Sequence, residues 1–173
     1  MRVDRAPELL GACRLDQFTR RLVGFGTHCG AVTGADVCRM CNAAICRQGA
    51  PRHLSTDHDP VFEAHRWTAN LRILEIAEIK TLPHVPLAHP FVERLIGTVR
   101  REFLDQVMFW NAGDLERKLT EFQTYYNAAR SHASLAGYTP FAVATGHTAV
   151  PADLNHMRWV SHCRGLVQVP VAT

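Results

Sequence analysis

The sequence predicts a mixed α/β fold, and three observations lead to that class. The chain has 173 residues, of which 47% are hydrophobic, which suits one domain with one core. Its apolar patterns follow the order strand, strand, helix, strand, helix, strand. The third strand is followed directly by an acidic residue, and open α/β sheets place their ligands at such strand ends.

The N-terminal part is predicted to form two paired strands after an irregular start. Residues 1–9 show neither a helical nor a strand period, and Pro7 disfavours a strand interior there. Residues 10–15 are a weak strand candidate, and a turn that begins at Asp16 leads into a second strand over residues 21–29. An antiparallel pair is the expected result.

A helix and a central strand are predicted next. Thr33 can cap a helix whose apolar face repeats every three and four residues and comprises Val37, Met40, Cys41, Ala44 and Ile45. Gly49 ends this helix. Residues 52–56 then form a short strand that delivers Asp57 to its C-terminal end.

The middle of the chain is predicted to hold a helix over residues 61–71 and a strand over residues 73–79. Pro83, Pro86 and Pro90 exclude a regular helix from residues 81–90, because each proline removes a backbone donor and restricts the residue before it. A loop therefore joins this strand to the next helix.

Two helices follow the loop. Pro90 suits a helix start, and the apolar stripe of that helix is Val92, Leu95, Ile96, Val99 and Phe103. Glu93 and Arg100 fall at the edge of the stripe, whereas Arg94 and Arg101 lie further towards water. Asn111, with Asp114 three residues later, predicts a capping box for the last helix, which ends near Ser131. Its predicted buried face is Leu115, Leu119, Phe122, Tyr126 and Ala129.

Three regions are expected along the chain. Residues 1–9 are an irregular N-terminus, residues 10–147 form the main α/β domain, and residues 148–173 form a C-terminal tail. The apolar residues of this tail indicate an added strand or a small subdomain.

The sequence around the acidic strand end resembles that of a known family. Thirty-five residues separate Asp57 from Glu93, an aromatic residue, Phe62, follows five positions after the aspartate, and the glutamate stands in Val92-Glu93-Arg94. This pattern is similar to the second Asp and the Glu of the Asp, Asp(35)Glu catalytic set in retroviral-type integrases and insertion-sequence transposases.

Two further motifs carry the same resemblance, and with the acidic pair they cover about residues 10 to 145. One is Asp16-x-Phe18-Thr19-Arg20-Arg21 with Gly24-Phe25, and the other is Tyr126-Asn127-x-x-Arg130-x-His132-x-x-Leu135, followed by Thr139-Pro140. The resemblance implies a ribonuclease H-like core, a mixed sheet of five strands flanked by helices. It also implies a first catalytic Asp on a strand that should precede residue 1, so the core is expected to be N-terminally truncated. Asp4 and Asp16 are poor replacements by position.

The implied chemistry is metal-dependent cleavage or joining of phosphodiesters. Asp57 and Glu93 would be ligands of Mg2+ or Mn2+, because hard cations require oxygen ligands. In isolation, an aspartate that caps a turn and a glutamate that favours a helix N-terminus would explain the same pair. Candidate phosphate contacts are Arg94, Arg100, Arg101 and Lys118, for each of which a solvated helix face is the alternative.

Other candidates are weaker. Asp59 is interpreted as a turn residue before Pro60, and His58 and His89 as exposed loop histidines. Cys38-x-x-Cys41 with Cys46 could suggest zinc, but a second ligand pair is missing and Cys41 falls on an apolar helix face. The six cysteines are expected to be reduced, the protein is expected to be cytoplasmic, and the formal charge of +3 permits DNA binding without requiring it.

The resulting hypothesis is an integrase or transposase catalytic core of a mobile element. Its partner would be DNA, it would form a homo-oligomer if functional, and it is expected to be inactive as this polypeptide because no first Asp is identified. One alternative is a non-catalytic DNA-binding or self-associating fragment that modulates an intact transposase. Another is a ribonuclease H-type nuclease, against which the ending from Tyr126 to Pro140 argues.

Overall fold

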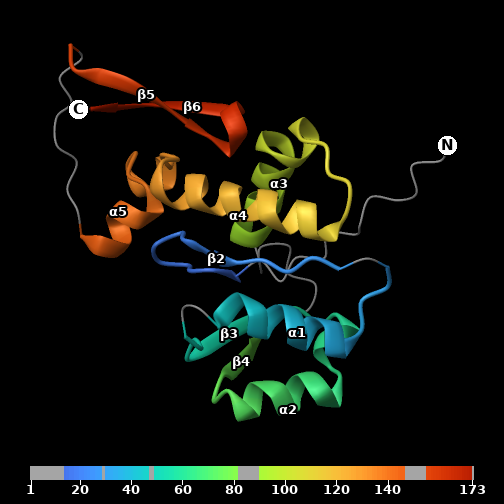
Figure 1. Cartoon of the computed structure of the whole chain (residues 1–173). Coiled ribbons are helices and arrows are strands. Elements are labelled where there is room, and N and C mark those ends of the chain that lie inside the picture. The colour runs from blue at the N-terminus through green and yellow to red at the C-terminus, as the bar shows by residue number, and fades with distance from the viewer. Residues whose placement is uncertain (1–13, 29, 47–48, 82–89, 147–154, 173) are drawn as a thin grey trace. The chain divides into compact units, whose positions relative to one another are not determined.

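The computed structural model describes residues 14–28, 30–46, 49–81, 90–146 and 155–172. The chain divides into two compact units, one comprising Met1–Arg14 and Val23–Arg100 and the other Leu15–Leu22 and Arg101–Thr173. Figure 1 labels the α-helices and most of the strands. His89 and the other residues of 82–89 lie outside the described ranges.

The first unit contains a parallel β-α-β segment. Strand β3 (His53–Thr56) pairs in parallel with β4 (Ala77–Lys80), so that Thr56 lies opposite Lys80. Helix α2 (His65–Ile73) makes the crossover that parallel strands need. The strand predicted at residues 52–56 is thereby confirmed within one residue.

The boundaries around α2 differ from those predicted. The chain first forms a 3-10 turn, η1 (Pro60–Phe62), and α2 begins only at His65, because Ala64 has an extended backbone. Ile73 is the last residue of α2 and is exposed, so the predicted strand over 73–79 is wrong at its start. Glu75, with a φ of 55°, reverses the chain before β4.

Helix α1 (Gly34–Ile45) matches its prediction closely. The Thr33 hydroxyl accepts a hydrogen bond from the Asp36 N–H, and the Asp36 carboxylate accepts one from the Thr33 N–H at 2.9 Å, which completes a capping box. All five predicted apolar residues are buried. The core of this unit combines side chains of α1, of α2 and of the residue before β4, namely Val37, Met40, Cys41, Ile45, Trp67, Leu71 and Ile76.

The first two strands are short. Strand β1 (Arg14–Leu15) pairs with β2 (Leu22–Gly24), which is much shorter than the predicted span of 21–29. Gly24 lies so close to α1 that a Cβ atom there would stand 2.6 Å from the Cβ of Ala44. Only a residue without a side chain permits this approach.

Helix α3 (Pro90–Glu102) begins where Pro90 predicted. Within the apolar stripe expected for it, Leu95, Val99 and Phe103 are buried, whereas Val92 and Ile96 are half-buried. The stripe is therefore confirmed, with Phe103 standing one residue beyond the helix.

The second unit is organised by helix α4 (Ala112–Ala128). Asn111 caps it through a 2.8 Å bond from the Asp114 N–H, as predicted, but the Asp114 carboxylate accepts from the Trp110 N–H and not from that of Asn111. The reciprocal half of the capping box is therefore displaced by one residue. Four of the five predicted apolar residues of α4 are buried, Ala129 is half-buried, and Tyr125 is an additional buried residue.

Shorter elements complete this unit. They are the 3-10 turns η2 (Leu104–Gln106), η3 (Ala133–Leu135) and η4 (Cys163–Gly165), helix α5 (Pro140–Thr145), and strands β5 (Met157–His162) and β6 (Val167–Ala172). The two strands form an antiparallel hairpin. None of the helices in the described ranges is long and apolar enough to cross a membrane.

Candidate metal and nucleic-acid site

The end of strand β3 is held by a hydrogen-bonded glutamate. The buried Thr56 hydroxyl donates to Glu78 Oε1 at 2.6 Å, and the Trp67 indole N–H donates to the same oxygen at 2.8 Å. Lys80 Nζ lies 3.1 Å from this oxygen and also donates to the carbonyl of Asp57 at 3.3 Å. Three side chains around one carboxylate thus fix the backbone on which Asp57 stands.

The charge of Glu78 is stabilised by these partners. Burial alone would raise the pKa of Glu78, but the hydrogen bonds from Thr56, Trp67 and Lys80 outweigh it and lower the pKa below its usual value. Glu78 is therefore an anion at neutral pH, and it ties β3, β4 and α2 together at the strand end.

Asp57 itself is exposed, directly after β3. Its Oδ1 accepts a hydrogen bond from the Asp59 N–H at 3.1 Å, while Oδ2 makes no hydrogen bond to a described residue. Asp59 in turn caps η1 by accepting from the Val61 N–H at 3.0 Å, which confirms its interpretation as a turn residue. His58 is exposed and places Nε2 2.7 Å from the carbonyl of Thr81.

Helix α3 presents the other predicted site residues. Glu93 stands in its first turn and is exposed, as are Arg94, Arg100 and Arg101. None of these four side chains forms an ion pair or hydrogen bond with another residue of the described ranges. Asp57 and Glu93 are the only metal ligands expected from the sequence. That they share one cation stays a prediction. Across residues 14–28, 30–46, 49–81, 90–146 and 155–172, no group of three or more His, Cys, Asp or Glu side chains could hold a metal ion.

Lys118 differs from the three arginines. Its ammonium lies 2.9 Å from Asp114 Oδ2 and also donates to the carbonyl of Met108, and its side chain is only 14% exposed. The hydrogen bond from Lys118 is the main cause that lowers the pKa of Asp114. Lys118 is therefore already partnered within the second unit.

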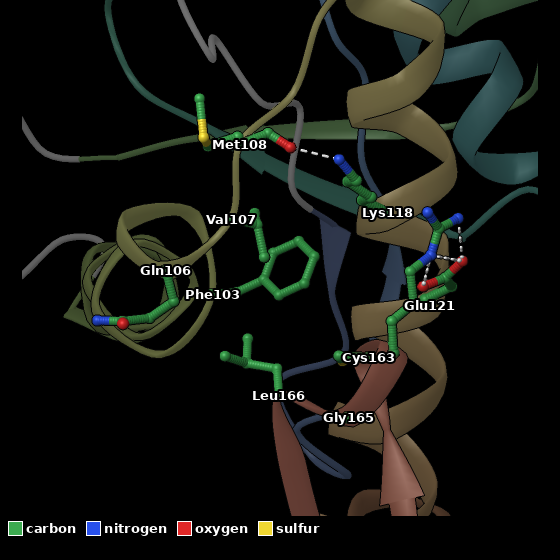
Figure 2. Close-up of a pocket in the computed structure, with 10 residues that line it drawn as sticks. Phe103, Gln106, Val107, Met108, Lys118, Glu121, Cys163, Gly165 and Leu166 are labelled. Carbon is green, nitrogen blue, oxygen red and sulfur yellow. Dashed lines mark hydrogen bonds and ion pairs between the residues drawn. The ribbon is translucent and has the colours of Figure 1, made fainter.

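Lys118 also lines an open cleft of about 480 Å³ in the second unit (Figure 2). Phe103, Val107, Met108 and Leu166 give this cleft apolar walls. On the same rim, Arg164 donates to the Glu121 carboxylate from Nη2 at 2.9 Å and from Nε at 3.1 Å. Neither Asp57 nor Glu93 lines it.

The four cysteines of the described ranges carry free thiols. Cys41 is buried in the core, as its place on the apolar face predicted. Cys38 is half-buried, and burial raises the pKa of its thiol. Cys163 lines the cleft, and burial, with the negative charge of Glu121 nearby, raises its pKa to about 11.

One charged cluster was not predicted as a site. Arg130 donates to both oxygens of Glu102, at 2.7 and 2.6 Å, and its third nitrogen lies 3.2 Å from His132 Nδ1. Asn127 brackets Leu22, accepting from its N–H at 2.8 Å and donating to its carbonyl at 2.9 Å. In the sequence, the Tyr-Asn-x-x-Arg-x-His motif was the signal that could have identified this cluster. The described contacts of its residues join parts of the second unit to one another.

Known proteins resemble this chain in sequence. Residues 75–140 match the family model described as integrase core domain. An insertion element IS476 uncharacterized 39.2 kDa protein from Xanthomonas euvesicatoria is 27% identical over 139 residues, which are 80% of this chain. The chain carries an integrase- or transposase-type core. It spans 40% of the length of that relative.

Solved structures show the same fold. The catalytic core domain of BIV integrase matches with a TM-score of 0.53 and 19% identity, over 73% of this chain and 82% of that one. The HTLV-2 integrase catalytic core domain in complex with magnesium matches with a TM-score of 0.57 and 18% identity, over 75% of this chain and 80% of that one. The predicted α/β, ribonuclease H-like class is thus confirmed for the integrase-type core, but the described strands pair as three two-stranded sheets and not as one mixed sheet of five strands.

Proposed function

We propose that this chain takes part in DNA integration or transposition and that Asp57 and Glu93 hold a divalent cation, Mg2+ or Mn2+. The supporting observation is the position of two exposed carboxylates, one directly after β3 and one in the first turn of α3, in an integrase-type core. Both offer the oxygen ligands that hard cations prefer. A bound ion would activate a water or 3′-hydroxyl and stabilise the leaving oxygen of a phosphodiester.

The carboxylate of Asp57 is oriented for such a role by its own turn. The Asp59 N–H holds Oδ1, which leaves Oδ2 available to a ligand, and Lys80 holds the carbonyl of Asp57 from the opposite strand. Glu93 has no described partner that a cation would need to displace. In this proposal the two residues would form a partial ligand set for one cation, which water or phosphate oxygens would complete.

We also propose that this polypeptide alone does not catalyse strand transfer. Two-metal phosphodiester chemistry uses carboxylates that bridge both ions, and no cluster of three ligating side chains exists within the described ranges. If no third carboxylate joins Asp57 and Glu93, the nucleophile would not be aligned with the phosphorus. The biological role that would go with this inactivity is a non-catalytic one, in which the chain modulates an intact transposase.

In this proposal DNA would bind to the solvent-exposed side of α3. Arg94 and Arg101 are seven residues apart, about two helical turns, and therefore lie on one side of the helix, whereas Arg100 lies about 100° around the helix from Arg101. Their exposed guanidinium groups suit phosphate contacts that position DNA without reading its sequence. Lys118 could contact phosphate only by giving up its pair with Asp114. Self-association is expected if the protein is functional.

A metal titration tests the proposal. Mn2+ binding by calorimetry should weaken by about tenfold or more in Asp57→Asn and in Glu93→Gln, since each change removes a charged oxygen ligand. Asp105→Asn and Glu116→Gln are matched controls, because both residues are exposed acids outside the pair. Equal Mn2+ affinity in all five proteins would refute the metal site. Joining of duplex ends by the parent protein would refute the proposed inactivity.

A further inference from the structure

Lys80 contacts both ends of the turn that carries Asp57. Its Nζ donates to the carbonyl of Asp57, the first residue of the turn, at 3.3 Å. The same Nζ donates to the carbonyl of Phe62, the last residue of η1, at 3.1 Å, and lies 5.8 Å from the centroid of the Phe62 ring. One ammonium group thus joins the two ends of residues 57–62.

The three N–H donors of this ammonium all have acceptors within the first unit. The third acceptor is Glu78 Oε1, at 3.1 Å. Glu78 and Lys80 stand on the same face of β4, because alternate residues of a strand point to the same side. An ammonium has no more than three hydrogens, so Lys80 has no donor left for a DNA phosphate. Its role is therefore internal.

Pairing with Glu78 does not explain the two carbonyl contacts of Lys80. Glu78 Oε1 already accepts from the Thr56 hydroxyl at 2.6 Å and from the Trp67 indole at 2.8 Å. A lysine that only neutralised this carboxylate would not need to reach two backbone carbonyls five residues apart. Those contacts act on the turn.

The hydrogen bonds inside the turn depend on its closed shape. The Asp59 N–H donates to Asp57 Oδ1 at 3.1 Å, and the Val61 N–H donates to Asp59 Oδ1 at 3.0 Å. Both amides belong to the backbone between the two carbonyls that Lys80 holds. The direction of the second oxygen of Asp57, Oδ2, therefore depends on Lys80 as well.

We propose that Lys80 is a positioning residue for the Asp57 carboxylate. By holding both ends of the turn, it keeps Oδ2 in the orientation that binds the divalent cation, and it does so without contacting the cation. This inference deepens the proposed function and rests on it, because it adds a residue that sets the metal affinity of Asp57.

Charge and geometry predict opposite effects of removing Lys80. An ammonium beside Asp57 repels a cation, and its removal also leaves the Glu78 carboxylate without its cationic partner. Both changes of charge should tighten Mn2+ binding. Loss of the ordered turn should weaken it, and partners that orient a metal ligand typically contribute about 10- to 100-fold to metal affinity. The sign of the change therefore separates the two effects.

Calorimetry with Mn2+ on the full chain measures this sign. Lys80→Met should weaken Mn2+ binding by about tenfold, the lower end of that range, because the change of charge opposes the loss. Lys80→Arg, which keeps a cation with several donors, should bind Mn2+ more tightly than Lys80→Met. Asn70→Ala is the matched control, because it removes hydrogen bonds of 3.0 and 3.1 Å to Asn42 in the same unit and does not touch the turn. It should lower the urea midpoint and leave the Mn2+ affinity unchanged.

A second background keeps the test available if Lys80→Met does not fold. Glu78→Gln retains an acceptor for Thr56 and Trp67, so Lys80→Met in this background leaves no carboxylate without its cationic partner. Relative to Glu78→Gln alone, the double variant should again bind Mn2+ about tenfold more weakly. A role of Lys80 through Glu78 alone would give no weakening in this background.

Amide hydrogen exchange measures the turn without any metal. The Asp59 and Val61 amides should exchange faster in Lys80→Met than in the parent protein, and at the parent rate in Asn70→Ala. Unchanged exchange in Lys80→Met would overturn the inference. Mn2+ binding by Lys80→Met that is as tight as that of the parent protein, or tighter, would also overturn it.

The two proposals fail in different variants. If Asp57→Asn and Glu93→Gln weaken Mn2+ binding but Lys80→Met does not, the metal site stands and the positioning role falls. If Asp57→Asn binds Mn2+ like the parent protein, the proposed metal site falls, and the exchange rates still decide whether Lys80 orders the turn.

Discussion

Replacing Arg130 tests how the end of the integrase-type core is held together. Arg130 makes two charge-assisted bonds to Glu102, at 2.7 and 2.6 Å, and lies 5.6 Å from the centroid of the Tyr126 ring. The side chains of Arg130 and Glu102 are 23% and 36% exposed. The pair therefore lies between an exposed one, which contributes about 0.2–1 kcal/mol, and a buried one, whose disruption costs about 3–5 kcal/mol.

We expect Arg130→Met to lower the free energy of unfolding by about 2–3 kcal/mol. Methionine keeps an apolar stem of similar length, so the loss reports mainly on the charge. The ion pair would account for about 2 kcal/mol of the loss, at the lower end of the range for hydrogen bonds to charged groups. The cation over Tyr126 would account for about 0.5–1 kcal/mol. Glu102→Gln combined with Arg130→Met should cost less than the sum of the single changes, because both remove the same bonds.

Urea unfolding followed by circular dichroism measures these values. Arg164→Met is the matched control, since Arg164 makes the same two-donor contact with Glu121 but its side chain is 54% exposed. Its effect should be clearly smaller than that of Arg130→Met. Equal effects of the two substitutions, or additive effects of the Glu102 and Arg130 changes, would refute the assigned role of the Glu102–Arg130 pair.

Three further predictions concern other parts of the structure. Burial, and then the neighbouring charge of Arg130, lowers the pKa of His132. The contribution of His132 to stability should therefore be complete above about pH 6.5 and should decrease as the pH falls below that value. His132→Gln should flatten this part of a curve of unfolding free energy against pH. Gly24→Ala should destabilise by about 1–3 kcal/mol in thermal or urea unfolding through its clash with Ala44, and Ala44→Gly in the same chain should recover part of the loss. Glu78→Gln should cost about 1 kcal/mol at neutral pH, and the difference from the parent in urea unfolding should shrink as the pH falls below the usual glutamate value, because the pKa of Glu78 is lowered in the folded protein.

The tautomer of His132 explains why its protonation is unfavourable. Arg130 can only donate, so Nδ1 of His132, which lies 3.2 Å from it, must accept. The neutral ring then carries its hydrogen on Nε2, which is buried without a hydrogen-bond partner. Protonation at Nδ1 would remove the bond from Arg130 and place two cations side by side.

Local signals predicted the helices well. A capping residue and an apolar repeat are both contained in about a dozen residues, so Thr33 and Asn111 identified the starts of α1 and α4 correctly. These local signals did not predict that the Asp114 carboxylate accepts from the Trp110 N–H. The choice between the N–H groups of Trp110 and Asn111 depends on how the preceding loop enters the helix.

Non-local contacts account for most of what the sequence did not predict. Glu78 looked like a polar residue in an alternating strand, and its bonds to Thr56 and Trp67 exist only once β3 and β4 pair in parallel. Glu102 and Arg130 are likewise 28 positions apart and come from different helical regions. No period or capping rule reports such pairs. For Asp57 and Glu93, by contrast, a metal-ligand role was predicted from the family-like number of residues between them, without any knowledge of their contacts.

The motifs of the integrase resemblance divide into two groups when their contacts are compared. Asn127, Arg130 and His132 bond to other parts of the second unit, so a fold without any activity would still need them. Glu93 and one oxygen of Asp57 have no partner among the described residues, and their removal should cost the fold little. The ligand role of the two carboxylates stays a prediction, and equal stability of Asp57→Asn, Glu93→Gln and the parent protein, together with weakened Mn2+ binding, would separate a ligand role from a structural one.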